Sequence, residues 1–244
     1  ERIRKIALDA DLAMIGPNCM GVLNPAARVD SVFLPIYKMG RPHSGGISFI
    51  SQSGAVGGCI VDLAARAGVG MSKFVSYGNA TVINEGHLLR YLTHDDSTQA
   101  VVSYMEGVKD GRLFMDSART LTESKPLVIL KAGKSKQGAA AAASHTGSLA
   151  GSAEVYSAAF EQVGALEAET LEELFDFAKI FARPLGIKDN LLAFLVLQEH
   201  LDLARKDHIQ RIGSIPLTDH DSVLGDNLLC GMCQQRLQLV LAQG

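Results

Sequence analysis

The chain has 244 residues, of which 47% are hydrophobic and 20% are charged, and its formal net charge is −3. This composition fits one large or two small globular domains and excludes a collagen-like or intrinsically disordered chain. Because no block of like charges occurs, neither a nucleic acid nor a membrane surface is expected as the main partner. No apolar run approaches the length of a bilayer span, and residues 1–20 lack a signal-peptide pattern.

Cysteine usage indicates a reducing compartment. The four cysteines, at positions 19, 59, 230 and 233, make no disulfide framework for a chain of this length, so reduced thiols in the cytoplasm are expected. Cys230 and Cys233 form a lone CxxC, which would suit half of a zinc site, with His208 or His220 nearby, or a redox pair. Neither interpretation has a second CxxC or a surrounding βαβ pattern to support it, and we predict no metal site.

Strands and helices alternate along most of the chain. The chain begins at Glu1 in a segment that already predicts a helix, RIRKIALDA, and we expect it to begin inside a longer protein. Apolar runs and helical spacing then predict a regular series of elements. Strands are expected at 46–50, 72–77, 100–105 and 126–130, and helices at 55–67, 84–92, 111–121, 152–163 and 170–182. This alternation predicts βαβ units and a mainly parallel sheet with both faces covered.

Several polar and glycine-containing turns directly follow predicted strands. They are the SQSG turn at 51–54, Gly78-Asn79, Glu106-Gly107 and the loop at 131–152. Ligands of parallel sheets bind at the carboxyl ends of strands, so these turns are expected to gather at one edge. Ser53, Gly54 and Ala55 open a helix there, and its free N–H groups would suit a phosphate. A simple N-cap role for Ser53 is the alternative.

The loop at 131–152, KAGKSKQGAAAAASHTGSLAGS, contains a single imidazole. His145 is flanked by small and hydroxyl residues: Ser144, Thr146 and Gly147. Small residues let backbone N–H groups approach an anion, and neutral imidazole can attack phosphorus near pH 7. A surface histidine in a flexible loop is the alternative. Glu106 lies on the same predicted edge, where it would fix the tautomer of the imidazole, unless it is only an exposed strand-end acid. Together these residues predict phosphoryl transfer through a phosphohistidine.

Five motifs occur in the order found in NDP-forming acyl-CoA synthetases. They are GPNCMG at 16–21, SQSGAVGG at 51–58, GNA at 78–80, YMEG at 104–107 and SHTGS at 144–148. Over about residues 1–184 the chain resembles the α-type part of ADP-forming acetate–CoA ligase, a relative of the succinyl-CoA synthetase α subunit. The resemblance implies a parallel-sheet α/β fold. Residues 1–42 would be the C-terminal remnant of a Rossmann-like CoA-binding domain, residues 43–184 a flavodoxin-like domain, and residues 185–244 an unassigned tail.

The resemblance also implies an acid–thiol ligase mechanism. An acyl-CoA and phosphate give an acyl phosphate, which phosphorylates a histidine that matches His145, and Glu106 matches the carboxylate that holds it. Ser53 and Gly54 match the helix start that binds phosphate. Mg-ADP or Mg-ATP would bind outside this chain, on an ATP-grasp partner subunit or domain. Asn18 and Cys19 lie in the motif that faces CoA or acyl-CoA, and a buried structural thiol is the alternative for Cys19.

Two other functions stay open from the sequence. Similar domains occur as acyl-CoA-sensing regulatory modules of protein acetyltransferases, and the chain could be an inactive fragment. The presence of His145 together with Glu106 favours the enzyme, because a sensor needs no nucleophile. The glycine-rich turn that would hold the phosphates of CoA is absent from this chain, which argues against CoA binding by this chain alone without deciding it.

Overall fold

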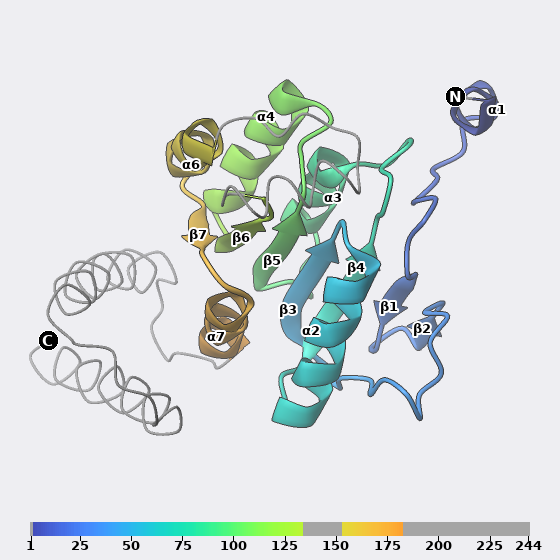
Figure 1. Ribbon diagram of the computed structural model, residues 1–244, viewed down its shortest axis with the longest axis vertical. Coiled ribbons are helices and arrows are strands. Elements are labelled where there is room, and N and C mark those ends of the chain that lie inside the picture. The colour runs from blue at the N-terminus through green and yellow to red at the C-terminus, as the bar shows by residue number, and fades with distance from the viewer. Residues whose placement is uncertain (1, 134–152, 183–244) are drawn as a thin grey trace, which may run out of the picture. The chain divides into compact units, whose positions relative to one another are not determined.

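The computed structural model describes residues 2–133 and 153–182, all within one unit that extends over residues 1–198. The described strands form a sheet in the order β2-β1-β4-β3-β5-β6-β7 (Figure 1). The strands are β1 Val22–Asn24, β2 Val29–Asp30, β3 Ser44–Ser51, β4 Met71–Ser76, β5 Ala100–Met105, β6 Leu127–Lys131 and β7 Leu166–Ala168. The helices are α1 Arg2–Asp9, α2 Gly54–Ala67, α3 Glu85–Thr93, α4 Gly111–Thr122, α6 Ala153–Gln162 and α7 Leu171–Ala182.

Strands β3 to β7 are parallel and have a flavodoxin-like order. In chain order they are the first to fifth parallel strands, and their spatial order is second, first, third, fourth, fifth. The strand order therefore reverses between β3 and β5, the place where doubly wound sheets bind ligands. Ser51 pairs with Tyr104 across these strands, so their carboxyl ends lie level. The predicted fold class is confirmed.

Three short strands were not predicted from the sequence. β1 runs antiparallel to both β2 and β4 and extends the sheet beyond β4. β7 adds a last parallel strand beside β6. Each has only two or three residues, too few for an alternating pattern to be recognised. The predicted tail at 185–244 lies outside the described residues.

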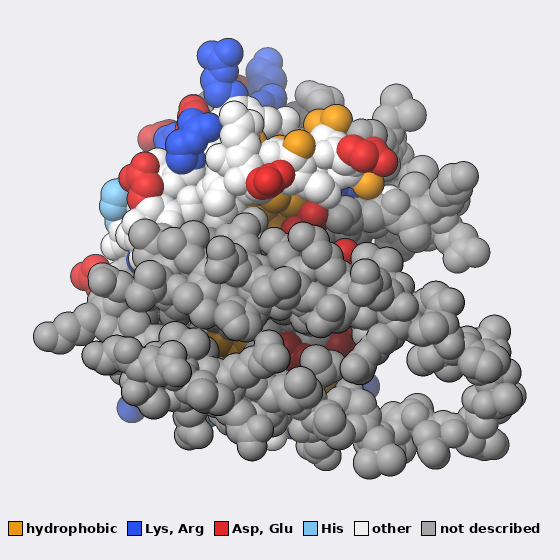
Figure 2. Space-filling model, turned by 90° about the vertical axis from the view of Figure 1, so that its left-hand side faces the viewer, with side chains coloured by type: hydrophobic (Ala, Val, Ile, Leu, Met, Phe, Trp, Pro, Cys, Tyr) orange, Lys and Arg blue, Asp and Glu red, His pale blue; other side chains and the backbone are white. Residues whose placement is uncertain are grey.

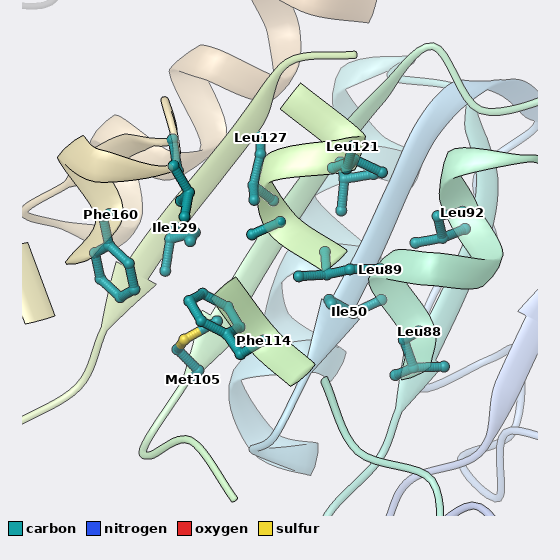
Figure 3. Close-up of a cluster of buried hydrophobic side chains, with 14 of the residues drawn as sticks. Ile50, Leu88, Leu89, Leu92, Met105, Phe114, Leu121, Leu127, Ile129 and Phe160 are labelled. Carbon is teal, nitrogen blue, oxygen red and sulfur yellow. The ribbon is translucent and has the colours of Figure 1, made fainter. Parts of the chain in front are cut away.

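One face of the sheet is covered by α3, α4 and α6. Their apolar side chains meet those of the strands in a buried cluster, in which α3 contributes three leucines (Figure 3). The labelled members are Ile50, Leu88, Leu89, Leu92, Met105, Phe114, Leu121, Leu127, Ile129 and Phe160. Burying one leucine or phenylalanine side chain contributes roughly 1.5–3 kcal/mol, so this cluster holds the three helices to the sheet.

Helix α2 lies very close to the sheet because glycine faces it. A Cβ at Gly57 would lie 2.8 Å from the Phe74 ring, and that ring stacks on Phe49 with centroids 5.9 Å apart. Close packing here sets the position of the first turn of α2 at the end of β3.

Over the described part of the face in Figure 2, Lys and Arg side chains lie among Asp and Glu. None of the described helices has the length and apolarity needed to span a bilayer.

Candidate functional site at the sheet edge

The first turn of α2 presents free backbone donors at the switch point. Ser53 is the N-cap, with extended backbone angles, and its Oγ accepts from the N–H of Val56 at 3.3 Å. The N–H groups of Gly54 and Ala55 donate to no residue that the structure describes. Since α2 runs for 14 residues, its dipole adds positive potential at the same point. The N-cap role of Ser53 is thus observed, and it leaves two donors for an anion.

Gln52 joins this turn to Glu106. Its backbone N–H donates to the Tyr104 carbonyl at 3.0 Å. Its side-chain Oε1 accepts from the N–H of Glu106 at 2.7 Å and from that of Gly107 at 3.1 Å. Two N–H partners require the amide oxygen at this position, which settles the orientation of the side chain. The structure therefore brings Ser53 and Glu106 to the same edge through Gln52, a residue that the sequence did not single out.

The GPNCMG loop lies against the end of β4 and the start of α2. Gly78 has φ +51°, and a Cβ there would lie 2.2 Å from the Asn18 carbonyl oxygen, so only glycine allows this approach. The N–H of Asn79 donates to the Pro17 carbonyl at 3.0 Å, and that of Met20 to Ser76 Oγ at 2.9 Å. A Cβ on Gly54 would lie 3.6 Å from the Met20 Cβ.

Asn18 and Cys19 therefore lie on the same edge as the α2 N-terminus. Asn18 is exposed, and its Nδ2 reaches the Asn79 side-chain oxygen at 3.5 Å. Cys19 is a half-buried free thiol, which is compatible both with a CoA-facing role and with the role of a structural thiol. Its Sγ would lie 2.8 Å from a Cβ on Gly16, where only glycine leaves room for it.

Buried acidic and phenolic groups lie beneath the edge. Burial raises the pKa of Tyr77 well above its usual value, and the charges of Glu85 and Glu106 raise it further. Burial also raises the pKa of Glu85 and, with the charge of Glu106, that of Tyr104. The Tyr77 hydroxyl and Glu85 Oε2 have no hydrogen-bond partner among the described residues. Glu106 itself is half-buried, so its carboxylate is not sealed beneath the edge.

The predicted imidazole loop is described only at its two flanks. Ser144, His145, Thr146 and Gly147 lie outside the described residues, as do Cys230 and Cys233. Before the gap, β6 ends at Lys131 on the same edge as Glu106, since Met105 pairs with Lys131. Within the described ranges, no group of three His, Cys, Asp or Glu side chains is placed to hold a metal ion.

Comparisons with known proteins identify the fold family. Residues 44–181 match the model of the succinyl-CoA ligase-like flavodoxin domain. The chain belongs to this family. It is 48% identical over 170 residues to ADP-forming acetate–CoA ligase I of Archaeoglobus fulgidus, covering 70% of this chain and 24% of the relative. It is 41% identical over 209 residues to the α subunit of ADP-forming acetate–CoA ligase II of Pyrococcus furiosus, covering 86% of this chain and 44% of the relative.

A solved structure agrees with these matches. Acetyl-coenzyme A synthetase 1 of Candidatus Korarchaeum cryptofilum, in complex with phosphate and ADP, superimposes with a TM-score of 0.69 at 37% identity. The match covers 74% of this chain and 39% of that one. The resemblance inferred from the five motifs is confirmed, and the relatives carry the names of ligases that join an acid to CoA. The chain spans less than half the length of each of these relatives.

Proposed function

We propose that this chain is the phosphate-shuttling part of an ADP-forming acyl-CoA synthetase. The reaction is acetate + CoA + ATP = acetyl-CoA + ADP + phosphate, and it runs in either direction. The observation that carries the proposal is the convergence at the β3–β5 switch point of two N–H donors, on Gly54 and Ala55, that no described residue accepts from, with the Glu106 turn. An anion site beside a carboxylate suits a histidine that accepts a phosphoryl group, because the helix N-terminus can bind the phosphate while the carboxylate holds the imidazole.

Each step has a group to perform it. Phosphate binds at the start of α2 and attacks the acyl carbonyl of acyl-CoA, so that an acyl phosphate forms and CoA leaves as the thiol. One ring nitrogen of His145 then attacks phosphorus, the P–O bond to the acyl group breaks, and the carboxylic acid leaves. Glu106 accepts a hydrogen bond from the other ring nitrogen and holds the tautomer. Ser144, Thr146 and Gly147 are assigned, with His145, to binding of the phosphoryl group.

The remaining sites complete the cycle. Asn18 and Cys19 face the CoA thiol end, supported by their position beside the α2 N-terminus. Mg-ADP takes the phosphoryl group from His145 on an ATP-grasp subunit or domain outside this chain. Two features of the relatives support this arrangement: one is named as an α subunit, and the Korarchaeum structure contains phosphate and ADP. We assign residues 1–42 to the end of the CoA-binding domain and expect the protein in the cytoplasm.

Labelling of His145 tests the proposal. The chain is incubated with Mg-ATP and an ATP-grasp partner subunit, and acid-labile, base-stable phosphate is measured. We expect label on the native chain and none on His145→Asn. Absence of label, with the same partner shown to label a full-length α chain, would instead support the acyl-CoA sensor or the inactive fragment. Retained acyl-CoA binding in His145→Asn would separate those two.

A further inference from the structure

The turn that begins at Glu106 is held by side chains at every backbone donor. Gln52 Oε1 accepts from the N–H groups of Glu106 and Gly107 at 2.7 and 3.1 Å. Tyr156 Oη accepts from the N–H of Val108 at 3.3 Å. Glu85 Oε1 accepts from the N–H of Lys109 at 2.8 Å.

These side-chain oxygens come from three separate elements. Gln52 precedes the N-cap of α2, Glu85 opens α3, and Tyr156 lies in the first turn of α6. In most loops such N–H groups bond to water or to other groups of the same turn. Here four consecutive N–H groups bond instead to side chains from distant parts of the sequence, which indicates that the fold fixes the conformation of this turn. Because every N–H of the turn is used, none of them is free to bind phosphate. The turn therefore contributes the Glu106 carboxylate, and the N-terminus of α2 is the part of this edge that would bind the phosphate.

Tyr156 also contacts Lys131 at the end of β6. The Lys131 Nζ lies 4.7 Å from the centroid of the Tyr156 ring, a favourable cation–π distance. Lys131 ends β6 on the N-terminal side of the segment at 134–152 that contains His145, and α6 begins at Ala153, directly after that segment. Tyr156 thus joins both flanks of that segment to the Glu106 turn. Through its hydroxyl, Tyr156 links the position of α6 to that of the turn that carries the Glu106 carboxylate.

We propose that Gln52 and Tyr156, with Glu85, are positioning residues that set Glu106 for the transfer of phosphate to histidine. The inference rests on the proposed function, and it gives these three residues a role that the five motifs did not assign to them. None of the three side chains needs to touch the reacting atoms. Each acts through the backbone of residues 106–109, and small displacements of an oriented carboxylate slow such a step strongly.

Two variants remove the acceptors with little change of shape. Gln52→Met leaves the N–H groups of Glu106 and Gly107 without their acceptor, and Tyr156→Phe does the same for Val108 while it keeps the ring beside Lys131. Matched controls are Gln162→Met, at the exposed end of α6, and Tyr37→Phe, whose side chain is 84% exposed.

The experiment measures single-turnover labelling of His145 from Mg-ATP with the partner subunit. We expect Gln52→Met and Tyr156→Phe to slow labelling by about tenfold or more without changing the partner concentration that gives half the maximal rate. Both controls should stay within about twofold of the native rate. If the native chain is labelled and both test variants match it, the inference is wrong. If the native chain itself is not labelled, the proposed function fails instead.

A second readout needs no activity. Amide hydrogen exchange should rise at Glu106 and Gly107 in Gln52→Met, and at Val108 in Tyr156→Phe, with other amides unchanged. Exchange that rises throughout the domain would mean general destabilisation and would contradict a local positioning role. Unchanged exchange at these three amides would show that the hydrogen bonds do not hold the turn, and it would overturn the inference.

Discussion

A partly buried charge network at the amino ends of the strands should contribute measurably to the stability. Asp95 lies before β5, and its Oδ2 is 2.5 Å from the Nζ of Lys73 in β4. Their side chains are only 14% and 10% exposed. Burial acts to raise the pKa of Asp95, but hydrogen bonds from Lys73, Thr98 and Ser97 outweigh it and hold the pKa at about 2, below the ordinary 3.8.

The pKa of Asp95 gives the size of the effect. A carboxyl that titrates at about 2 when folded and at 3.8 when unfolded stabilises the fold by roughly 2 kcal/mol at pH 7. This contribution is present above the unfolded pKa and falls as the pH drops through 3.8 toward 2, reaching about half its neutral value near pH 3. Asp95→Asn should therefore lower the free energy of unfolding by roughly 2–3 kcal/mol at pH 7, since Lys73 also loses its counter-charge.

Urea unfolding at several pH values between 7 and 3 measures this difference. The loss caused by Asp95→Asn should shrink by about half across that range. Asp176→Asn is the control, because Asp176 pairs with Lys179 on the surface, where both side chains are well exposed. A loss below about 0.5 kcal/mol at pH 7, or a loss equal at both ends of the range, would refute the reasoning. His145 labelling of folded Asp95→Asn should match the native chain, since Asp95 lies at the opposite edge.

Two smaller changes test the carboxyl edge. Burial raises the pKa of Glu85, so its ionisation opposes folding as the pH rises above its unfolded value. Glu85→Gln keeps an acceptor for the N–H of Lys109. The urea midpoint of this variant minus that of the native chain should increase between pH 4.5 and 7, and a decrease would contradict this. Gly78→Ala should destabilise the fold by more than Gly68→Ala does. Both glycines have positive φ, which costs about 1 kcal/mol for alanine, but only at Gly78 would the Cβ meet backbone, 2.2 Å from the Asn18 oxygen. Equal urea midpoints for the two alanine variants would show that the GPNCMG loop moves aside freely.

Regular periodicity made the larger elements predictable. Apolar runs and helical spacing located β3 to β6 and their helices, and the parallel-sheet rule then placed Ser53 and Glu106 at one edge. Neither step needs a distance between residues far apart in sequence. The bonds that join the turns do need such distances. Gln52 and Glu106 are separated by 54 residues, and Tyr156 and Val108 by 48, so local patterns carry no sign of either contact.

For some sequence features, two interpretations could be compared only once the backbone conformation was known. Ser53 is the N-cap, and among the described residues the N–H groups of Gly54 and Ala55 have no acceptor, while the phosphate role of Ser53 stays a prediction. Gly78 was noted as part of a turn, but its close approach to Asn18 follows from a positive φ that the sequence does not show. The phosphate and CoA roles of these residues stay predictions, as does the role of His145.

If the proposed function holds, the charges at the carboxyl edge give a physical reason for a histidine there. A phosphate at the α2 N-terminus and the carboxylate of Glu106 carry like charges, and Gln52 ties the two turns directly together. Two anions at this edge repel each other unless a group with positive character lies between them. Imidazole gains that character as its nitrogen attacks phosphorus, and its other nitrogen then donates to the carboxylate. The repulsion in the ground state thus becomes attraction along the reaction. Under the proposed function, an edge that combines the Gly54 and Ala55 N–H groups with a fixed carboxylate would therefore favour transfer to histidine over simple storage of phosphate.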